Sequence, residues 1–117
     1  GGHSPDHADF SKLDRSEVIG QVKSSIEGLQ QRFGLDTRYF SFPFTSQGVP
    51  VGLIEEMLKK KVATVMMGTA GLKKITNRGF IQRIPMEEFG LPAGEVLKTE
   101  YLYYLLKGLV GRNSIRD

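Results

Sequence analysis

Between residues 18 and 33, apolar residues recur every three or four positions and polar residues fill the gaps. The members of this stripe are Val18, Val22, Ile26, Leu29 and Phe33. Such spacing predicts an amphipathic helix of about five turns with one buried face. Asp14 lies before the stripe as an N-cap, and Glu17, three residues later, completes a capping box. Gly34 follows the stripe, where a glycine commonly ends a helix in the left-handed conformation.

Two later segments also show helical spacing. Residues 51–61 are expected to form a second helix, and its inward-facing residues are Leu53, Ile54, Met57 and Leu58. Residues 94–109 are expected to form the last helix, with an apolar stripe along one side. The members of that stripe are Val96, Leu97, Tyr101, Leu105 and Leu109. The polar residues 1–12 are predicted to be a loop, and residues 111–117 are predicted to fray.

Three short apolar runs fit buried strands. Residues 39–42 are mostly aromatic and stop at Pro43, residues 62–67 are nearly all apolar, and residues 80–84 stop at Pro85. The middle run is expected to be covered on both faces. Strands that alternate with helices predict an α/β protein with a parallel sheet. Because so few strands leave sheet edges open, we interpret residues 1–117 as a single domain that is part of a larger α/β layer or barrel.

Composition and charge change this picture little. Of the 117 residues, 39% are hydrophobic and 25% are charged, as in an ordinary globular domain. No apolar run approaches the roughly 20 residues needed to cross a bilayer, so we expect no membrane span. The absence of cysteine excludes disulfides and a thiolate metal site. The net charge is +3, but the run at residues 59–61 and the pair at 73–74 are not interleaved with aromatics. We therefore expect no nucleic-acid partner.

Two histidines lie four residues apart in the segment HSPDH, at residues 3–7. Two imidazoles plus an oxygen ligand suit a divalent ion such as Zn²⁺ and leave positions open for water and substrate. Such an ion lowers the pKa of bound water and polarises a carbonyl group. Two alternatives stay open at this point. In the first, His3 and His7 are ordinary surface residues of an N-terminal stretch and bind no metal. In the second, a free Gly-Gly-His terminus chelates Cu²⁺ or Ni²⁺ through backbone nitrogens.

Four segments, taken in order, resemble a known enzyme family. GHSPDHAD at residues 2–9 precedes the first predicted helix, and RYFSFPF at residues 38–44 follows it. GTAGLK at residues 68–73 and QRIPME at residues 82–87 come later. This arrangement resembles the polysaccharide deacetylases of carbohydrate esterase family 4, in particular a bacterial subgroup. Their second motif is a His, a Ser or Thr, two variable residues and a His, and their third is a strand that ends in Pro and an aromatic residue. The resemblance covers nearly the whole chain.

The resemblance implies a distorted (β/α) barrel with a divalent metal, Zn²⁺ in the first place, at its strand ends. In that family an Asp and two His hold the metal, and a neighbouring Asp activates the water that attacks an acetyl carbonyl. His3 and His7 match the metal-binding histidines. The backbone N–H of Phe44 matches the donor that stabilises the oxyanion. Substrate binding falls to Phe42, Pro43 and Phe44, although core packing beside a turn is an equal alternative for the two aromatic residues.

The chain also departs from the family pattern. The first motif, which supplies the Asp ligand and the catalytic base, is expected upstream of residue 1. Ser41 stands where many members have an Arg, and the late His that acts as general acid has no counterpart. Arg83, Glu87 and Asp6 are polar residues that a divergent subgroup can use instead, and Asp6 is also placed to orient His3 or His7.

We therefore expect the intact parent protein to remove acetyl groups, N-linked or sometimes O-linked, from a polysaccharide or glycan. The isolated chain is expected to be inactive or nearly so, because two imidazoles without carboxylates bind metal weakly. Its exposed apolar surface is expected to favour self-association. The alternative is a catalytically inactive family member that binds glycans or a protein. The compartment stays open between the bacterial cytoplasm and the cell envelope.

Overall fold

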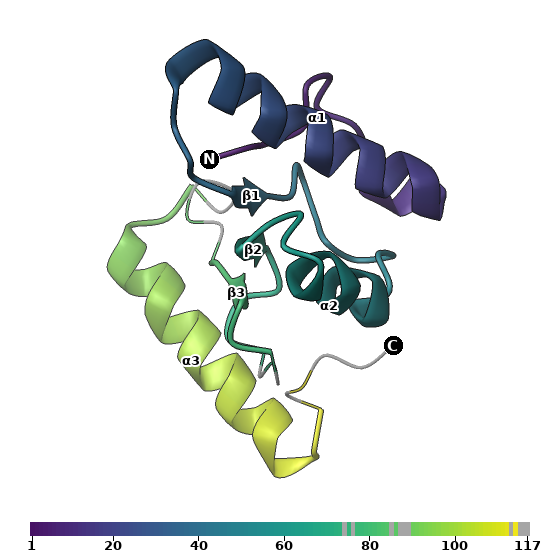
Figure 1. Ribbon diagram of the computed structural model, residues 1–117. Coiled ribbons are helices and arrows are strands. Elements are labelled where there is room, and N and C mark those ends of the chain that lie inside the picture. Colours follow the sequence, from purple (N-terminus) through teal and green to yellow (C-terminus); the bar gives the residue numbers. More distant parts are fainter. Residues whose placement is uncertain (74, 76, 85, 87–89, 113, 115–117) are drawn as a thin grey trace.

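The computed structural model describes residues 1–73, 75, 77–84, 86, 90–112 and 114 (Figure 1). These residues form one 3₁₀ helix, three α-helices and three strands. In chain order the elements are η1 (Phe10–Lys12), α1 (Arg15–Phe33), β1 (Tyr39–Ser41), α2 (Val51–Lys59), β2 (Val65–Gly68), β3 (Phe80–Gln82) and α3 (Ala93–Leu109). Helices and parallel strands alternate over most of this length, which confirms the predicted α/β class at this level.

The three strands form one parallel sheet in the order β1-β2-β3. A fourth segment extends it, because Gly2 forms an isolated parallel bridge with Phe40 on the free edge of β1. The Gly2 N–H donates to the Tyr39 carbonyl at 2.6 Å, and the Ser41 N–H donates to the Gly2 carbonyl at 2.8 Å. A Cβ on Gly2 would lie 2.6 Å from the Ser25 hydroxyl oxygen, so a larger residue here would displace that side chain. Gly2 therefore forms the edge of the sheet, residues 3–9 are the loop that was predicted, and Phe10–Lys12 form a 3₁₀ helix instead of loop.

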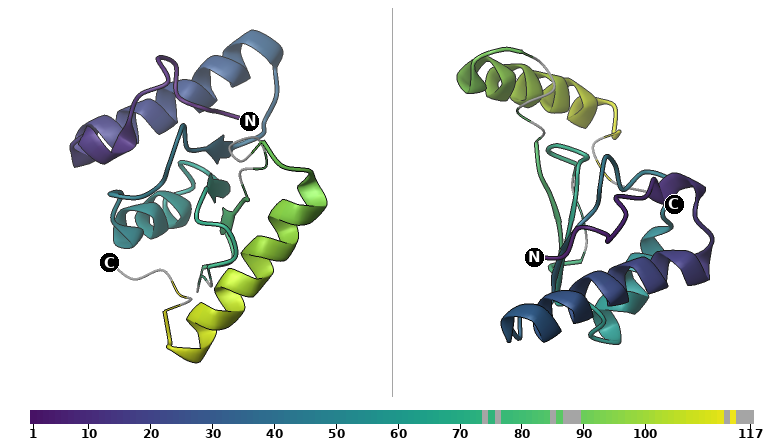
Figure 2. Two further views of the ribbon diagram at one scale, coloured as in Figure 1. Left: turned by 180° about the vertical axis from the view of Figure 1, so that it is seen from behind. Right: turned by 90° about the horizontal axis from the view of Figure 1, so that it is seen from above.

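α1 and α2 lie on one side of the sheet, and the strands separate them from α3 (Figures 1 and 2). The hydrophobic core lies between the sheet and the first two helices. An aromatic cluster forms its centre, in which the Phe42 ring packs edge-on against Phe10, Phe40 and Phe80. The other buried residues of this core are Val18, Val22, Ile26, Val49, Leu53, Ile54, Met57, Ala63 and Met66. The first three confirm the inward face of the first predicted helix.

The predicted ends of α1 are also confirmed. The Asp14 side chain accepts a hydrogen bond from the Glu17 N–H, and the Glu17 side chain accepts one from the Asp14 N–H. Gly34 ends the helix with φ +64°. The apolar stripe, however, is buried only in its first three members. Phe33 is 62% exposed, because the last turn of α1 extends past the sheet.

The strands differ from the prediction in two ways. They are shorter: β1 and β3 end one and two residues before their predicted ends, and β2 begins three residues late and ends one residue late. Pro85, which was predicted to stop the third strand, lies outside the described residues. The middle strand is also not covered on both faces. Met66 and Gly68 are buried under the helices, whereas Val65 and Met67 point to the other side and are half-exposed. The cause is that α3 does not pack flat on that second face.

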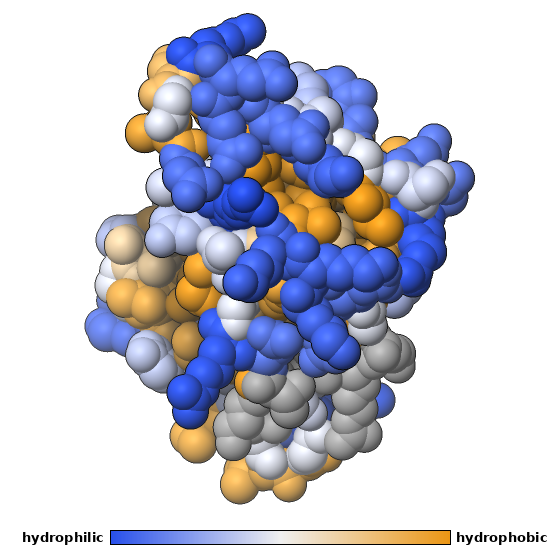
Figure 3. Space-filling model, viewed as in Figure 1, coloured by the Kyte–Doolittle hydropathy of each residue, from blue (hydrophilic) through white to orange (hydrophobic). Residues whose placement is uncertain are grey.

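α3 follows its predicted bounds within one residue, but its apolar stripe is not buried. Of that stripe only Val96 is fully buried, while Leu109 is 79% exposed. Leu102 and Leu106 are exposed as well, and Figure 3 shows hydrophobic atoms along the lower left, where α3 lies. The radius of gyration is 15.2 Å, against about 13 Å for a compact domain of this length. Among the described residues, no helix has the length and apolar character to cross a membrane.

Ile26 and Phe33 lie on the same stripe of α1 and differ in burial, so they form a matched pair. Replacing buried Ile26 by Ala removes core contacts, and we expect the free energy of unfolding to fall by about 2–4 kcal/mol. The Phe33→Ala change removes a mostly exposed ring and should cost less than about 1 kcal/mol. Urea titration followed by circular dichroism measures both. Equal losses would contradict this placement of the core.

The exposed face of α3 leads to a prediction about association. Contiguous exposed apolar patches of this kind commonly bind another surface. We expect the chain to self-associate at micromolar concentration and the double variant Leu102→Glu/Leu106→Glu to shift it toward monomer in sedimentation velocity. Ser24→Glu, which adds one charge to the exposed side of α1, is the control and should leave the association unchanged. A wild-type monomer at all concentrations would refute the prediction.

Candidate metal centre

His3 and His7 lie at the carboxyl edge of the parallel sheet. His3 directly follows the edge residue Gly2, and its ring reaches the carbonyl of Ser41, the last residue of β1. The backbone N–H of His3 donates to the Ser25 hydroxyl of α1 at 2.9 Å. In parallel α/β proteins this edge is where ligands bind, because loops of adjacent strands converge there.

The structure brings the two imidazoles together. The Nε2 atoms of His3 and His7 are 3.1 Å apart, and their ring centroids are 4.9 Å apart. The Nδ1 atom of His3 lies 2.8 Å from the Ser41 carbonyl oxygen, which can only accept a hydrogen bond. A neutral His3 ring therefore carries its proton on Nδ1 and directs the lone pair of Nε2 toward His7.

This arrangement fits a metal ion. Histidines that bind metal usually donate their other ring N–H to a backbone carbonyl or a carboxylate, as His3 does. Two nitrogens at Zn–N distances of 2.0–2.1 Å in a tetrahedral site stand about 3.3 Å apart. The observed separation of 3.1 Å is close to that value. The two histidines can thus serve as neighbouring ligands of one divalent ion with little movement.

Hydrogen bonds to α1 hold the loop between the two histidines. The Ser4 hydroxyl lies 2.8 Å from the Gln21 side-chain oxygen and accepts the Ala8 N–H at 3.2 Å. Asp6 accepts hydrogen bonds from Ser4 and from the Gln21 side-chain amide, each at 3.1 Å. Asp6 therefore stabilises the loop through Ser4 and Gln21. It makes no hydrogen bond to either imidazole among the described contacts, contrary to the expectation that it orients His3 or His7.

The described residues supply no third metal ligand beside His3 and His7. Within the described residues, no group of three or more His, Cys, Asp or Glu side chains converges as a metal site would require. Arg83, a candidate substitute for missing catalytic groups, donates to the Phe42 carbonyl at 3.0 Å and so braces the neighbouring loop. Glu87, another candidate, lies outside the described residues. Two histidines are thus the only ligands that the described structure offers.

The residues expected to bind substrate divide into two kinds. Phe42 has no exposed surface and belongs to the aromatic core, and Pro43 is also fully buried. This is the packing that the alternative interpretation anticipated for Phe42. Phe44 is 63% exposed, and its ring packs edge-on against His7 with the centroids 4.5 Å apart. No described residue accepts a hydrogen bond from the Phe44 backbone N–H. Phe44 is therefore the member of this group that is free to meet a ligand.

Backbone strain is concentrated at this site. Among the described residues other than glycine, four have positive φ, and three of them are Ser4 at 69°, His7 at 55° and Phe44 at 50°. This conformation is costly for L-residues, above all for a bulky one such as Phe. Strained backbone persists where the surroundings enforce it and is often found at functional sites. The clustering supports a functional role for the loop that holds the two histidines.

The sequence motifs did not reveal the supports of this site. Ser25 and Gln21 hold the histidine loop from α1, and the Ser41 carbonyl fixes the ring of His3. The one available signal was their spacing, since residues four apart on a helix lie on the same side. A backbone carbonyl leaves no mark in the sequence at all.

Comparison of the chain with known proteins yields no matching family model, no similar characterised protein and no similar solved structure. The function must therefore be argued from the arrangement of the residues themselves.

Asp9 lies at the end of the loop that holds the two histidines, as the N-cap of η1. Its carboxylate makes the free energy of unfolding depend on pH. Hydrogen bonds from the Ser11 hydroxyl, from Lys12 and from the Ser11 N–H lower the pKa of Asp9 from 3.8 to about 2. A lowered folded-state pKa adds stability above the unfolded value, and this stability is lost as the pH falls through the folded value. We expect the free energy of unfolding to fall between about pH 4 and pH 2 and to fall less in Asp9→Asn.

Denaturant titrations across that pH range measure this effect. Asp14 and Glu56, whose pKa values are also lowered, account for part of the decline that remains in Asp9→Asn. Asp36→Asn, at a side chain that is 93% exposed, is the matched control and should retain the wild-type slope. An identical slope in Asp9→Asn would show that this carboxylate does not contribute.

Proposed function

We propose that this chain forms part of the active site of a metal-dependent deacetylase that acts on a polysaccharide or glycan. The observation that carries the proposal is the convergence of His3 Nε2 and His7 Nε2 at 3.1 Å, with the other ring nitrogen of His3 facing a backbone carbonyl. Imidazoles held in this way are typical of metal sites. The proposed reaction, removal of an acetyl group, is inferred from the resemblance of the surrounding segments to the polysaccharide deacetylases.

The sheet supports the proposal that the parent fold is a (β/α) barrel. The edge segment at Gly2, then β1, β2 and β3, lie side by side in chain order, and all are parallel. A doubly wound sheet reverses its strand order at a switch point, whereas a barrel keeps chain order throughout. The face opposite α1 and α2 carries Val65, Met67 and Ile81, which are apolar yet partly exposed. The interior of a barrel would cover such residues.

In this proposal His3 and His7 hold a divalent ion, with Zn²⁺ as the first choice. When bound, such an ion polarises the acetyl carbonyl and lowers the pKa of water. The exposed ring of Phe44 forms one wall of the acetyl pocket beside His7. Its backbone N–H, which meets no described acceptor, donates to the carbonyl oxygen as negative charge develops there. Phe42 and Pro43 support this loop from the core.

The carboxylates of the reaction must come from outside the described residues. A water-activating base and a carboxylate ligand are needed for efficient hydrolysis, and none converges on His3 and His7 here. We propose that they lie on a segment that adjoins the free edge at Gly2, because that edge is the one closest to His3 along the sheet. The chain alone should show little or no hydrolysis.

A second candidate function is a glycan-binding or protein-interaction module without catalysis. The observation in its favour is the same lack of a third converging ligand within the described part of the chain. In this case the strained loop and Phe44 would contact a sugar ring but no metal would be needed. Metal binding therefore separates the two candidates.

The Gly-Gly-His alternative is disfavoured by the fold. That chelate needs the backbone nitrogens of residues 2 and 3 together with Nδ1 of the imidazole. Here the Gly2 N–H donates to Tyr39, the His3 N–H donates to Ser25, and Nδ1 faces Ser41. Chelation would have to break all of these bonds, which hold the segment to the sheet.

The test is calorimetric titration with Zn²⁺ of the wild-type chain, of His3→Ala and His7→Ala, and of a chain with an acetylated N-terminus. We expect the wild type and the acetylated chain to bind one Zn²⁺ per chain with similar affinity. Each His→Ala variant should lose at least about tenfold in affinity, because one of two protein ligands is gone. Folding of each variant is checked by circular dichroism.

The outcomes separate the candidates. Binding lost on acetylation alone would identify a terminal chelate, and no Zn²⁺ binding in any form would favour the non-catalytic module. Binding that depends on both histidines leads to an assay of the full-length parent on acetylated glycans, with acetate release as the readout. A parent without activity that still binds Zn²⁺ through these histidines would refute the deacetylase proposal.

A further inference from the structure

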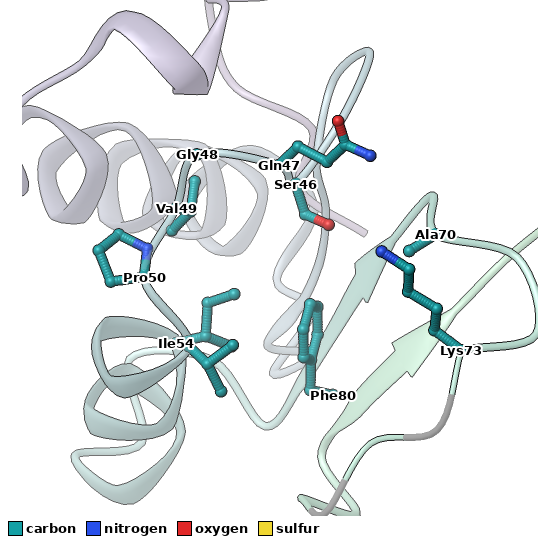
Figure 4. Close-up of a pocket in the computed structure, with 10 residues that line it drawn as sticks. Ser46, Gln47, Gly48, Val49, Pro50, Ile54, Ala70, Lys73 and Phe80 are labelled. Atoms are coloured by element: carbon teal, nitrogen blue, oxygen red, sulfur yellow. The ribbon is translucent and has the colours of Figure 1, made fainter. Parts of the chain in front are cut away.

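A pocket with a second polar cluster lies at the same edge of the sheet as the histidines. It measures about 340 Å³ and lies between the loop after β1, the first turn of α2 and the loop after β2 (Figure 4). Pockets of roughly this size hold small ligands. Val49, Ile54 and Phe80 form apolar walls. Ser46 and Lys73 are polar members of its lining.

Ser46 is a buried polar residue whose hydroxyl has no partner among the described residues. Its side chain lines the pocket and the residue is only 8% exposed. The hydroxyl forms no hydrogen bond with any described residue, and its oxygen is not among the buried atoms that lack a partner, so it keeps access to the pocket. Figure 4 shows its oxygen directed toward the side of the pocket where Ala70 and Lys73 lie. An oxygen atom of a ligand would give this hydroxyl an acceptor.

A second unpartnered donor lies beside Ser46. The Gln82 side-chain oxygen accepts the Ala70 N–H at 2.7 Å, which fixes the orientation of the amide. Its Nε2 atom is buried and has no hydrogen-bond partner in the described structure. A Cβ on Gly68 would lie 2.4 Å from the Ser46 hydroxyl oxygen and 2.7 Å from Gln82 Nε2. The Gln82 side-chain oxygen lies 2.4 Å from the same point, so the space over Gly68 is filled and the Ser46 hydroxyl and the Gln82 amide lie close together there.

A positively charged side chain also lines the pocket near Ser46. Lys73 contributes its side chain to the lining, and its ammonium group points toward Ala70 and Ser46 (Figure 4). Lys73 forms no ion pair with any described carboxylate. A hydroxyl, an amide NH₂ and an ammonium group are all donors. The ligand that satisfies them is an acceptor with negative charge.

We propose that this pocket binds the carboxylate of an acidic sugar, such as a uronic acid unit, in the glycan substrate. This inference rests on the proposed deacetylase function. A carboxylate oxygen accepts from the Ser46 hydroxyl, and the negative charge of the carboxylate pairs with Lys73. The apolar walls suit the C–H faces of a sugar ring. The pocket would therefore make the enzyme specific for an acidic glycan.

The position of the pocket fits one extended substrate. Ser46 follows Phe44 by only two residues, and a chain of two residues spans at most about 7 Å. The proposed acetyl site beside His7 and the proposed pocket for an acidic sugar are therefore close enough for neighbouring sugar units of one glycan. Both lie at the carboxyl edge of the sheet, since Ser46 and Ala70 belong to the loops that follow β1 and β2.

The test is titration of the ¹⁵N-labelled chain with glucuronate, in the absence of metal and followed by NMR. Glucose, which lacks the carboxylate, and inorganic phosphate are titrated in parallel. We expect glucuronate to shift the amide signals of Ser46, Ala70 and Lys73, with a Kd at least about tenfold lower than that of glucose. Lys73→Gln should weaken glucuronate binding about tenfold, because it removes a charge-assisted hydrogen bond.

Gln82→Glu provides a second variant of nearly unchanged shape. It keeps an oxygen for the Ala70 N–H but replaces the free NH₂ by a negative oxygen, so it should abolish the binding. Lys59→Gln, on the exposed end of α2, is the control and should bind as the wild type does. Equal binding of glucose, or an unchanged Kd in Lys73→Gln and Gln82→Glu, would overturn the proposal. Phosphate that binds more tightly than glucuronate at the same residues would also overturn it.

Because no metal is present, this result is separate from the test of the proposed function. Glucuronate binding without Zn²⁺ binding would leave an acidic-sugar pocket in a non-catalytic module. Zn²⁺ binding through both histidines without any glucuronate binding would support the deacetylase proposal and overturn the proposal that it is specific for acidic glycans.

Discussion

The structure depends on the packing of α1 and α2 against the aromatic face of the sheet. Phe40 and Phe42, from one short strand and the residue after it, contact the rings of Phe10 and Phe80. Burial of such rings is the largest favourable term available to a domain of this size. Phe10 follows the histidine loop, and Gly2 precedes it at the sheet edge. The loop is thus held at both ends, which is what allows Ser4 and His7 to keep costly backbone conformations.

Much of this fold follows from the sequence because the signals are local. The stripe from Val18 to Ile26 and the capping box at Asp14 specify α1 by spacing and hydrogen-bonding capacity within a few residues. Burial near the ends of elements depends on distant partners, so Phe33 and the outer face of α3 could not be placed in this way. Phe10 was missed as a core residue because its neighbours are polar. At the site, His3 and His7 were predictable from their spacing, whereas the supporting carbonyl of Ser41 was not.

The exposed apolar surfaces have a common physical explanation. Among the described residues the sheet has two open edges, one face of β2 is half-exposed, and α3 presents leucines to solvent. Each feature lowers the stability of an isolated domain and invites association. All of them would disappear if further strands continued the sheet in chain order and closed it. The same closure would bring additional residues to the carboxyl edge, where the described residues supply two imidazoles and no carboxylate.

The carboxyl edge of the sheet is also where the molecule leaves its polar groups unsatisfied. Among the described residues, Gln82 Nε2 is buried without an acceptor, the Ser46 hydroxyl forms no hydrogen bond, and the imidazoles of His3 and His7 contact each other through their Nε2 atoms. A core optimised for stability alone would pair or remove such groups. Their concentration at one edge, together with three strained residues, is better explained by ligands that complete them. A cation between the imidazoles and an anion between Ser46 and Lys73 would do so with opposite charges on one substrate-binding surface.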